Sequence, residues 1–229
     1  MKVFRGSQGI SESIQAVEGA MLSDAGVYIG SRHAHFTMKQ SYKEHLDWLN
    51  YLAACFENLG ISSTVRPYEQ DGCRDGLCYI LQSRVHPWLT GQRWRWYPNG
   101  KKIVPDDLHL TPITIANWIM GDGSVRFGWT TAQVAVINPC IVLSTQGFDL
   151  NNVEKLREKL QRVGVRDTCH YKTNNKSSGV AILVKREGTS KIRSAIGEYV
   201  APSFQYKMRG PIIIRPNIRP YTIGGSHDN

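Results

Sequence analysis

The stretch Thr111-Pro-Ile-Thr-Ile-Ala-Asn-Trp-Ile-Met-Gly-Asp-Gly123 decides the fold of this chain of 229 residues. Thr111 is a favourable helix N-cap, Pro112 suits the first helical position, and Gly123 suits a helix stop. The stretch therefore predicts a short helix that ends at Asp122.

An earlier stretch has the same design, Ser11-Glu-Ser-Ile-Gln-Ala-Val-Glu-Gly-Ala-Met-Leu-Ser-Asp-Ala-Gly26, with Ser11 as the expected N-cap. Both predicted helices end on an aspartate, Asp24 in one and Asp122 in the other, 98 positions apart (122 minus 24). A carboxylate at a helix C-terminus is unfavourable by roughly 0.3–1 kcal/mol. One such aspartate is ordinary turn chemistry, but two at matching places indicate a function.

The rest of the sequence repeats as well. One longer helix is expected from the capping box of Ser41 and Glu44, and another from near Asn151. Their last turns match at an offset of 104 positions (156 minus 52), through the pairs Leu52/Leu156, Phe56/Leu160, Leu59/Val163, Gly60/Gly164 and Ile61/Val165. Third helices are expected near residues 85–94 and 190–200. The prediction is an α+β fold of two αββαββα half-repeats.

The chain divides accordingly into an N-terminal half, residues 1–105, and a C-terminal half, residues 106–209. The boundary follows the turn-rich residues 97–100. A proline-rich tail, residues 210–229, is expected to lie extended over the surface.

Composition limits the classes of function. Hydrophobic residues make up 41% of the chain and six tryptophans are present, which excludes a disordered or coiled-coil protein. Lys and Arg outnumber Asp and Glu by 28 to 19, and a net charge of +9 indicates a polyanionic partner such as nucleic acid. Apolar stretches are too short for a membrane span and the N-terminus lacks a secretion signal, so no membrane association is expected.

The five cysteines, an odd number at irregular spacing, favour a reducing compartment, either the cytoplasm and nucleoid of a prokaryote or an organelle. Cys73 and Cys78 could form a loop disulfide or half of a metal site. No second pair at zinc spacing follows, so free thiols are expected.

Alternating residues predict sheets with one polar face. His33, His35 and Lys39 take the odd positions of residues 33–39, and in residues 166–172 the even positions are assigned to the polar face. This face is rich in basic residues and poor in Glu, which favours DNA contact over an ordinary solvated surface. A metal site at His33 and His35 would need a third ligand. The residues expected to contact DNA are Arg32, His33, His35, Lys39, Arg66, Arg74, Arg126, Arg166, His170, Lys172 and Arg186.

Small residues line one side of each aspartate-bearing helix. They are Ala16, Gly19, Ala20 and Ser23 in the first helix and Ala116, Asn117 and Gly121 in the second. Close packing of the two helices would bring Asp24 and Asp122 side by side, where the carboxylates repel each other. A divalent cation would relieve this repulsion, and a ligand set of oxygen atoms alone favours Mg²⁺ over zinc.

The residues Leu110-Thr-Pro followed by Ile115-Ala-Asn-Trp-Ile-Met-Gly-Asp-Gly123 resemble the signature motif of the LAGLIDADG homing endonucleases. Val17-Glu-Gly-Ala-Met-Leu-Ser-Asp-Ala25 resembles a degenerate copy that ends in Ala instead of Gly. The resemblance covers residues 10–208 and is to the monomeric, pseudo-twofold members. It implies saddle-shaped antiparallel sheets that lie in the DNA major groove, a two-helix interface, and catalytic metals bound by Asp24 and Asp122.

The same resemblance implies basic and glutamine side chains around the metals. Lys102 and Lys207 follow the third helix of each half, 105 positions apart (207 minus 102). Gln40 and Gln146 precede the second helix of each half. Lys101 is an alternative to Lys102.

The expected activity is hydrolysis of both strands of a long, asymmetric DNA target, with two or three Mg²⁺ ions as cofactor and Mn²⁺ able to substitute. Backbone carbonyls of Ser23 and Gly121 are expected to help hold the ions. The length leaves no room for a flanking self-splicing domain, so an intron-encoded or free-standing reading frame is expected instead of an intein. The alternatives are a maturase that binds intron RNA and a DNA-binding protein that no longer cleaves.

Overall fold

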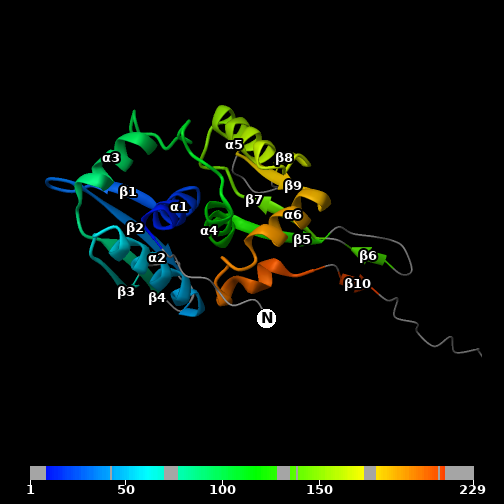
Figure 1. Ribbon diagram of the computed structural model, residues 1–229, viewed down its shortest axis with the longest axis horizontal. Coiled ribbons are helices and arrows are strands. Elements are labelled where there is room, and N and C mark those ends of the chain that lie inside the picture. The colour runs from blue at the N-terminus through cyan, green and yellow to red at the C-terminus, as the bar shows by residue number, and fades with distance from the viewer. Residues whose placement is uncertain are drawn as a thin grey trace, which may run out of the picture.

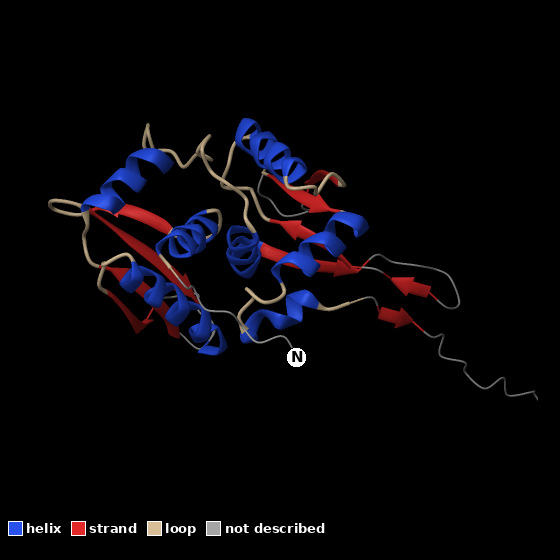
Figure 2. Cartoon of the chain, in the orientation of Figure 1, coloured by secondary structure: helices blue, strands red, loops and turns tan. Residues whose placement is uncertain are grey.

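The computed structural model describes residues 9–41, 43–69, 77–127, 135–137, 139–172, 179–210 and 212–214. Its centre is a pair of adjacent helices, and a four-stranded antiparallel sheet lies on either side of them (Figure 1). Further helices cover the outer parts of each sheet (Figure 2). The arrangement is the predicted α+β fold of two related halves.

The N-terminal half contains α1 (Ile10–Met21), β1 (Gly26–Ile29), β2 (Ala34–Gln40), the 3-10 turn η1 (Lys43–His45), α2 (Leu46–Asn58), β3 (Ser63–Glu69), β4 (Leu77–Ser83) and α3 (Pro87–Trp96). Its sheet has the order β1-β2-β4-β3. The C-terminal half contains α4 (Pro112–Asp122), β5 (Gly123–Phe127), β6 (Ala135–Ile137), β7 (Pro139–Leu143), α5 (Leu150–Arg162), β8 (Thr168–Lys172), β9 (Val180–Val184), α6 (Arg186–Ile196) and η3 (Pro202–Met208). Its sheet has the equivalent order β5-β7-β9-β8.

The ends of α2 and α5 confirm the repeat seen in the sequence. Gly60 and Gly164 both have positive φ, +71° and +85°, a conformation that glycine adopts without strain. The following residues, Ile61 and Val165, are both buried. Each chain reversal therefore returns an aliphatic side chain to the core at the same point of its half.

The predicted beginnings of three helices are corrected. The first helix, α1, begins at Ile10 after Gly9, one residue before Ser11. No capping box opens α2, because residues 43–45 form the turn η1 and the helix begins at Leu46. The N-cap of α5 is Asp149, whose carboxylate accepts a hydrogen bond from the backbone N–H of Asn152.

Outside the repeat, one feature was not predicted and one expectation is wrong. Part of the tail forms a strand, β10 (Ile212–Ile214), which pairs antiparallel with β6 and projects with it from the C-terminal half (Figure 1). Cys78 is disulfide-bonded, whereas a free thiol was expected. Cys73 and residues 215–229 lie outside the described residues. Within the part of the chain that is described, no helix has the length and apolar character to cross a bilayer.

Candidate active site at the helix interface

The two central helices, α1 and α4, are called the motif helices below, and they pack at unusually short range. A Cβ on Gly19 would clash with the backbone of Thr114 and lie 2.6 Å from Cβ of Asn117. A Cβ on Gly121 would clash with the side chain of Ser23. In the 98-residue repeat, Gly19 is equivalent to Asn117 and Ser23 to Gly121. Equivalent positions therefore meet across the pseudo-twofold axis, and at each crossing one partner is glycine.

A buried polar network fixes the lateral position of the motif helices. The indole Nε1 of Trp48, on α2, donates a hydrogen bond of 2.8 Å to Oδ1 of Asn117. The amide Nδ2 of Asn117 donates to the backbone carbonyl of Ile113 at 2.9 Å. Trp48 and Asn117 are fully buried, so the network ties α2 of one half to the motif helix of the other.

This packing brings Asp24 and Asp122 together at the C-terminal ends of the motif helices. Asp24 is exposed and Asp122 is partly covered. Burial, and after it the nearby Asp24 carboxylate, raise the pKa of Asp122 to about 7, against the opposing effect of Lys102 and Lys207. Neither aspartate forms an ion pair with an arginine among the described residues. The carboxylates are thus mutually repelling groups beside two ammonium groups.

Both predicted lysines reach the helix ends. Nζ of Lys102 donates to the carbonyls of Ser23 and Ala25, at 2.9 and 3.0 Å. Nζ of Lys207 donates to the carbonyls of Ile119 and Met120, at 2.9 and 2.7 Å. Burial lowers the pKa of each lysine to about 8, against the opposing effect of the two aspartates. Ammonium groups at helix C-termini are favourable because they satisfy carbonyls that the helix leaves open.

The structure places Lys102 at the site instead of its neighbour. Lys101 points away and forms a partly exposed ion pair with Asp149, 3.6 Å long. Lys102 is mostly buried and lies 5.7 Å from the ring centroid of Phe148.

The segments that carry the lysines are held by the opposite half. The backbone N–H of Val104 donates to Oδ1 of Asn152, in the first turn of α5, at 2.7 Å. The backbone N–H of Ser203 donates to Oδ2 of Asp47, in the first turn of α2, at 2.9 Å. We call these two hydrogen bonds the reciprocal clasp. Each lysine therefore contacts the motif helix of its own half, while its segment is anchored to the other half.

The two predicted glutamines have different surroundings. Gln40 lines a hollow of about 270 Å³ that it shares with Asp24, Gly121 and Lys207. Its Oε1 lies 3.0 Å from Nδ1 of His45, whose pKa is lowered by burial and by the charge of Lys207. Gln146 packs against Gly179, immediately before β9. His45 was not among the predicted residues, since no repeat partner drew attention to it.

The oxygen atoms at the helix ends suit a hard divalent cation. The described residues contain no group of three His, Cys, Asp or Glu side chains that could enclose a metal. Ions here would use the carboxylates of Asp24 and Asp122, with backbone, water and phosphate oxygens completing the shell, as Mg²⁺ accepts. The carbonyl of Ser23 already accepts from Lys102, whereas the carbonyl of Gly121 has no such lysine contact.

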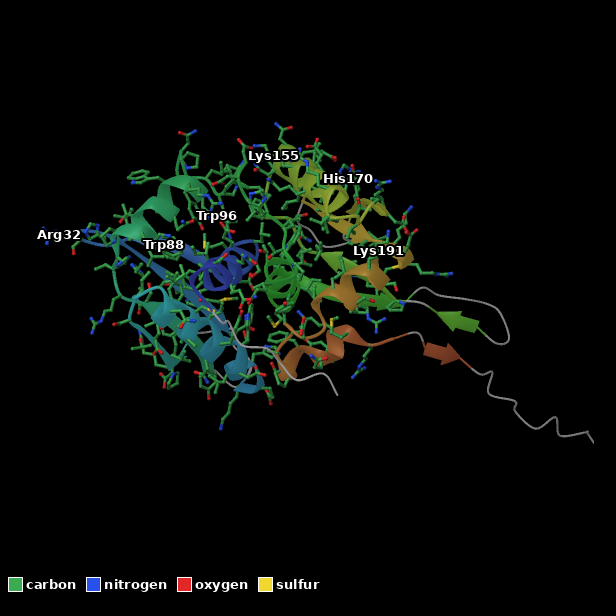
Figure 3. The ribbon with its side chains drawn as sticks, viewed as in Figure 1. Arg32, Trp88, Trp96, Lys155, His170 and Lys191 are labelled. Atoms are coloured by element: carbon green, nitrogen blue, oxygen red, sulfur yellow. The ribbon has the colours of Figure 1, made fainter. Side chains whose placement is uncertain are left out.

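The open face of the N-terminal sheet, which no helix covers, carries three of the six predicted DNA-contacting residues of that half. Ala34, Phe36 and Met38 of β2 are buried, which leaves His35 and Lys39 on the open face. Arg66 of β3 shares that face, because it lies opposite Ile80, which also lies opposite Lys39. Two others lie at the margin, Arg32 in the turn after β1 (Figure 3) and His33 beside Thr90. Arg74 lies outside the described residues.

The face predicted for β8 is wrong. Thr168 is buried, and His170 forms an ion pair with Glu154 of α5, so the even positions face the covering helix (Figure 3). Lys172 shares that side by alternation. His170 and Lys172 are nevertheless exposed, because β8 is the edge strand of its sheet. Tyr171 lies on the open face instead, where its hydroxyl accepts a hydrogen bond from Arg126 of β5.

Two further predicted residues lie near α6. Arg166 precedes β8 and lines a hollow beside the first turn of α6. Arg186 is the first residue of that helix.

The comparisons with known proteins agree with this geometry. A family model described as the LAGLIDADG DNA endonuclease family matches residues 14–192, and the chain belongs to that family. The uncharacterized protein MJ1098 of Methanocaldococcus jannaschii is 26% identical over 205 residues, which cover 87% of this chain and 75% of that protein. The cytochrome b mRNA maturase bI2 of Debaryomyces hansenii is 27% identical over 213 residues, covering 86% of this chain and 73% of the maturase.

Two solved structures share the fold. The homing endonuclease I-WcaI bound to its DNA recognition sequence has a TM-score of 0.71 and 19% identity, with 90% of each chain covered. I-DmoI in complex with DNA and Mn has a TM-score of 0.52 and 11% identity, covering 82% of this chain and 98% of that one. Both the family and the fold predicted from the two motifs are confirmed.

Proposed function

We propose that this protein is a site-specific endonuclease that cleaves both strands of a long, asymmetric DNA target in the presence of Mg²⁺, for which Mn²⁺ substitutes. The observation that carries the proposal is the juxtaposition of Asp24, Asp122, Lys102 and Lys207 at the ends of the motif helices. No fold requirement explains two repelling carboxylates at one helix interface. Phosphodiester hydrolysis, by contrast, uses both acidic metal ligands and nearby cations.

In this mechanism Asp24 and Asp122 would hold two or three divalent ions, with help from the backbone carbonyls of Gly121 and Ser23. Such ions would supply an activated water and stabilise charge on the phosphate oxygens. The lysines lie beside the reacting phosphates and balance the negative charge that builds up there. Gln40 orients solvent in the hollow it shares with Asp24, and Gln146 is proposed for the same task in the second half.

DNA would lie across the open faces of both sheets. Cations on the helix-covered side are paired with acids, as in Lys155 with Asp106 and Lys191 with Glu187. Arg66 and Arg126, on the open faces, have no acidic partner among the described residues. Two joined faces cover about two turns of duplex, or about 20 base pairs. Because the halves differ in sequence, a monomer would recognise an asymmetric site.

The test is cleavage of a plasmid that carries the target, taken from the joined exons around the gene or selected from random duplexes. Wild-type protein should linearise the plasmid in Mg²⁺. Asp122→Asn should bind the same duplex with similar affinity and leave it intact, since it loses metal charge but little shape. Cleavage by Asp122→Asn at the wild-type rate would refute the proposal.

A second function, as an RNA maturase, is favoured by the maturase of D. hansenii among the relatives. Gel shifts with the host intron RNA and with target DNA separate the two activities. Splicing assistance that survives Asp24→Asn and Asp122→Asn, in a protein without nuclease activity, would make the maturase function the correct one.

A further inference from the structure

Each sheet carries a tyrosine at an equivalent place on its outer strand. Tyr68 of β3 lies opposite Cys78 of β4, and Tyr171 of β8 lies opposite Ala181 of β9. Both members of the second pair follow the first by 103 positions (171 minus 68, and 181 minus 78). The match is one of strand register, and the local sequences around the two tyrosines differ.

A cation from another strand lies against each tyrosine. Nζ of Lys39, on β2, is 4.6 Å from the ring centroid of Tyr68. The guanidinium carbon of Arg126, on β5, is 5.1 Å from the ring centroid of Tyr171, and its Nη1 donates to the tyrosine hydroxyl at 2.9 Å. Such contacts are within the range of cation–π attraction. We call each pair a cation–tyrosine strut.

Both struts run diagonally across the middle of the open face. Lys39 lies opposite Ile80, so its side chain crosses β4 to reach Tyr68. The strut of Arg126 crosses β7 and β9, above Val142, which lies opposite Ser124. Ile80 and Val142 point to the open face yet are only 6% and 2% exposed. Each strut therefore holds a cation on a face whose middle strands carry buried apolar residues.

Holding the cation in this way favours base recognition. Lysine and arginine side chains lose rotamer entropy when they are fixed on binding, and a strut imposes part of that loss before DNA binds. Arg126 uses one of its five N–H donors on the tyrosine, which leaves the remainder of the fork available. Arg and Lys contacts to O6 and N7 of guanine are the commonest specific contacts in the major groove.

We propose that Tyr68 and Tyr171 are positioning residues that aim Lys39 and Arg126 at one guanine in each half of the DNA target. The inference rests on the proposed function for its DNA partner and adds the determinant of base specificity. The tyrosine should position its cation more firmly in the C-terminal half, where Arg126 also donates a hydrogen bond to Tyr171. The neighbouring cation Lys185 is paired with Asp167 at 3.5 Å, whereas Arg126 has no acidic partner among the described residues.

The experiment measures base preference without cleavage. Full-length protein in EDTA is incubated with duplexes in which every base pair of the selected target is varied in turn. Tyr171→Phe retains the ring and removes the hydrogen bond, whereas Tyr171→Leu removes both. The preference for guanine at one base pair of the C-terminal half-site should fall about tenfold in Tyr171→Leu and by less in Tyr171→Phe. Preferences in the other half-site should not change.

The N-terminal half supplies the matched control. Tyr68→Phe retains the cation–π contact and should leave the preferences as they are, while Tyr68→Leu should weaken guanine preference in the N-terminal half-site only. In wild-type protein, 7-deazaguanine at either position, which lacks the N7 acceptor, should reproduce the loss. In Tyr68→Leu and Tyr171→Leu, 7-deazaguanine should cause little further loss of binding.

A uniform fall in affinity over all sequences, or no change at any base pair, would overturn the inference. Thermal melts of the variants accompany the binding data, and Tyr171→Phe still tests the inference if Tyr171→Leu does not fold. The two proposals fail separately. Cleavage with unaltered base preference in the variants refutes the struts alone, while altered preference without cleavage by wild-type protein refutes the nuclease alone.

Discussion

Ser23, in the turn after α1, and Gly121, in α4, hold equivalent positions of the repeat, and the side chain of Ser23 occupies the space that a Cβ at position 121 would need. Oγ of Ser23 is itself fixed, since it donates to the carbonyl of Ala20 at 2.9 Å. Asp24 follows Ser23, and Asp122 follows Gly121. The close contact between Ser23 and Gly121 therefore sets the spacing between the two aspartates, since neither residue can move away from the other.

Gly121→Ala should consequently lower the melting temperature, with a loss of about 1–3 kcal/mol in unfolding free energy from overpacking. Gly91→Ala is the matched control, because Gly91 also lies in a helix but has no atom within 4 Å of its added Cβ. It should leave stability unchanged or raise it by about 0.5–1 kcal/mol. Equal melting temperatures for the two variants would show that the interface is not tight.

The metal-free protein should lose stability as pH rises from about 4 to about 7. The pKa of Asp122 is about 7 in the folded protein and 3.8 in the reference state, so the folded protein binds the extra proton in this window. The unfolding free energy should fall on the order of 3–4 kcal/mol across it. Thermal melts in EDTA at several pH values measure this, Asp122→Asn should flatten the profile, and Mg²⁺ should restore stability near pH 7.

Replacing either buried lysine should abolish most cleavage. Lys102→Met and Lys207→Met keep the aliphatic stem but remove the charge beside the aspartates, so cleavage rates should fall by about a hundredfold or more. Lys101→Met is the control, because Lys101 forms only a partly exposed ion pair with Asp149. If Lys101→Met lowered the cleavage rate as much as Lys102→Met, the assignment of Lys102 instead of Lys101 to the site would be wrong.

Arg66→Ala and His170→Ala should affect DNA affinity differently. Arg66 lies on the open face, so its loss should weaken binding by about 1–3 kcal/mol if it contacts a guanine. His170 is engaged with Glu154 on the helix-covered side, and its loss should leave affinity nearly unchanged. Quantitative gel shifts at one fixed salt concentration are the measurement. Equal losses for the two variants would place DNA elsewhere.

Sequence alone predicted the parts of the fold that repeat. Gly60 and Gly164 mark equivalent helix ends because positive φ is a local requirement, visible in the residue type. Thr111 caps α4 as predicted, since its hydroxyl accepts from the backbone N–H of Thr114. The aspartates were predicted for the same reason, as matching residues at matching points, whereas the lysines were predicted from the family resemblance together with their matching spacing.

Features that depend on the neighbours of a strand or helix could not be predicted in this way. Alternation in residues 168–172 shows that two faces exist, but which one α5 covers is decided by its contacts with Thr168 and His170. The expected capping box failed because Asp47, one turn later, accepts hydrogen bonds from Ser203 in the other half. Contacts with residues distant in the sequence therefore determine which face of a strand is covered and where a helix begins.

The reciprocal clasp has a mechanical consequence. Because Val104 is bonded to Asn152 and Ser203 to Asp47, neither half can tilt against the other without dragging the lysine segment of its partner. A duplex of the wrong curvature would spread the two saddles and pull both ammonium groups away from the aspartates at once. In the proposed nuclease, the fit of the DNA along its whole length would thereby affect the positions of both lysines.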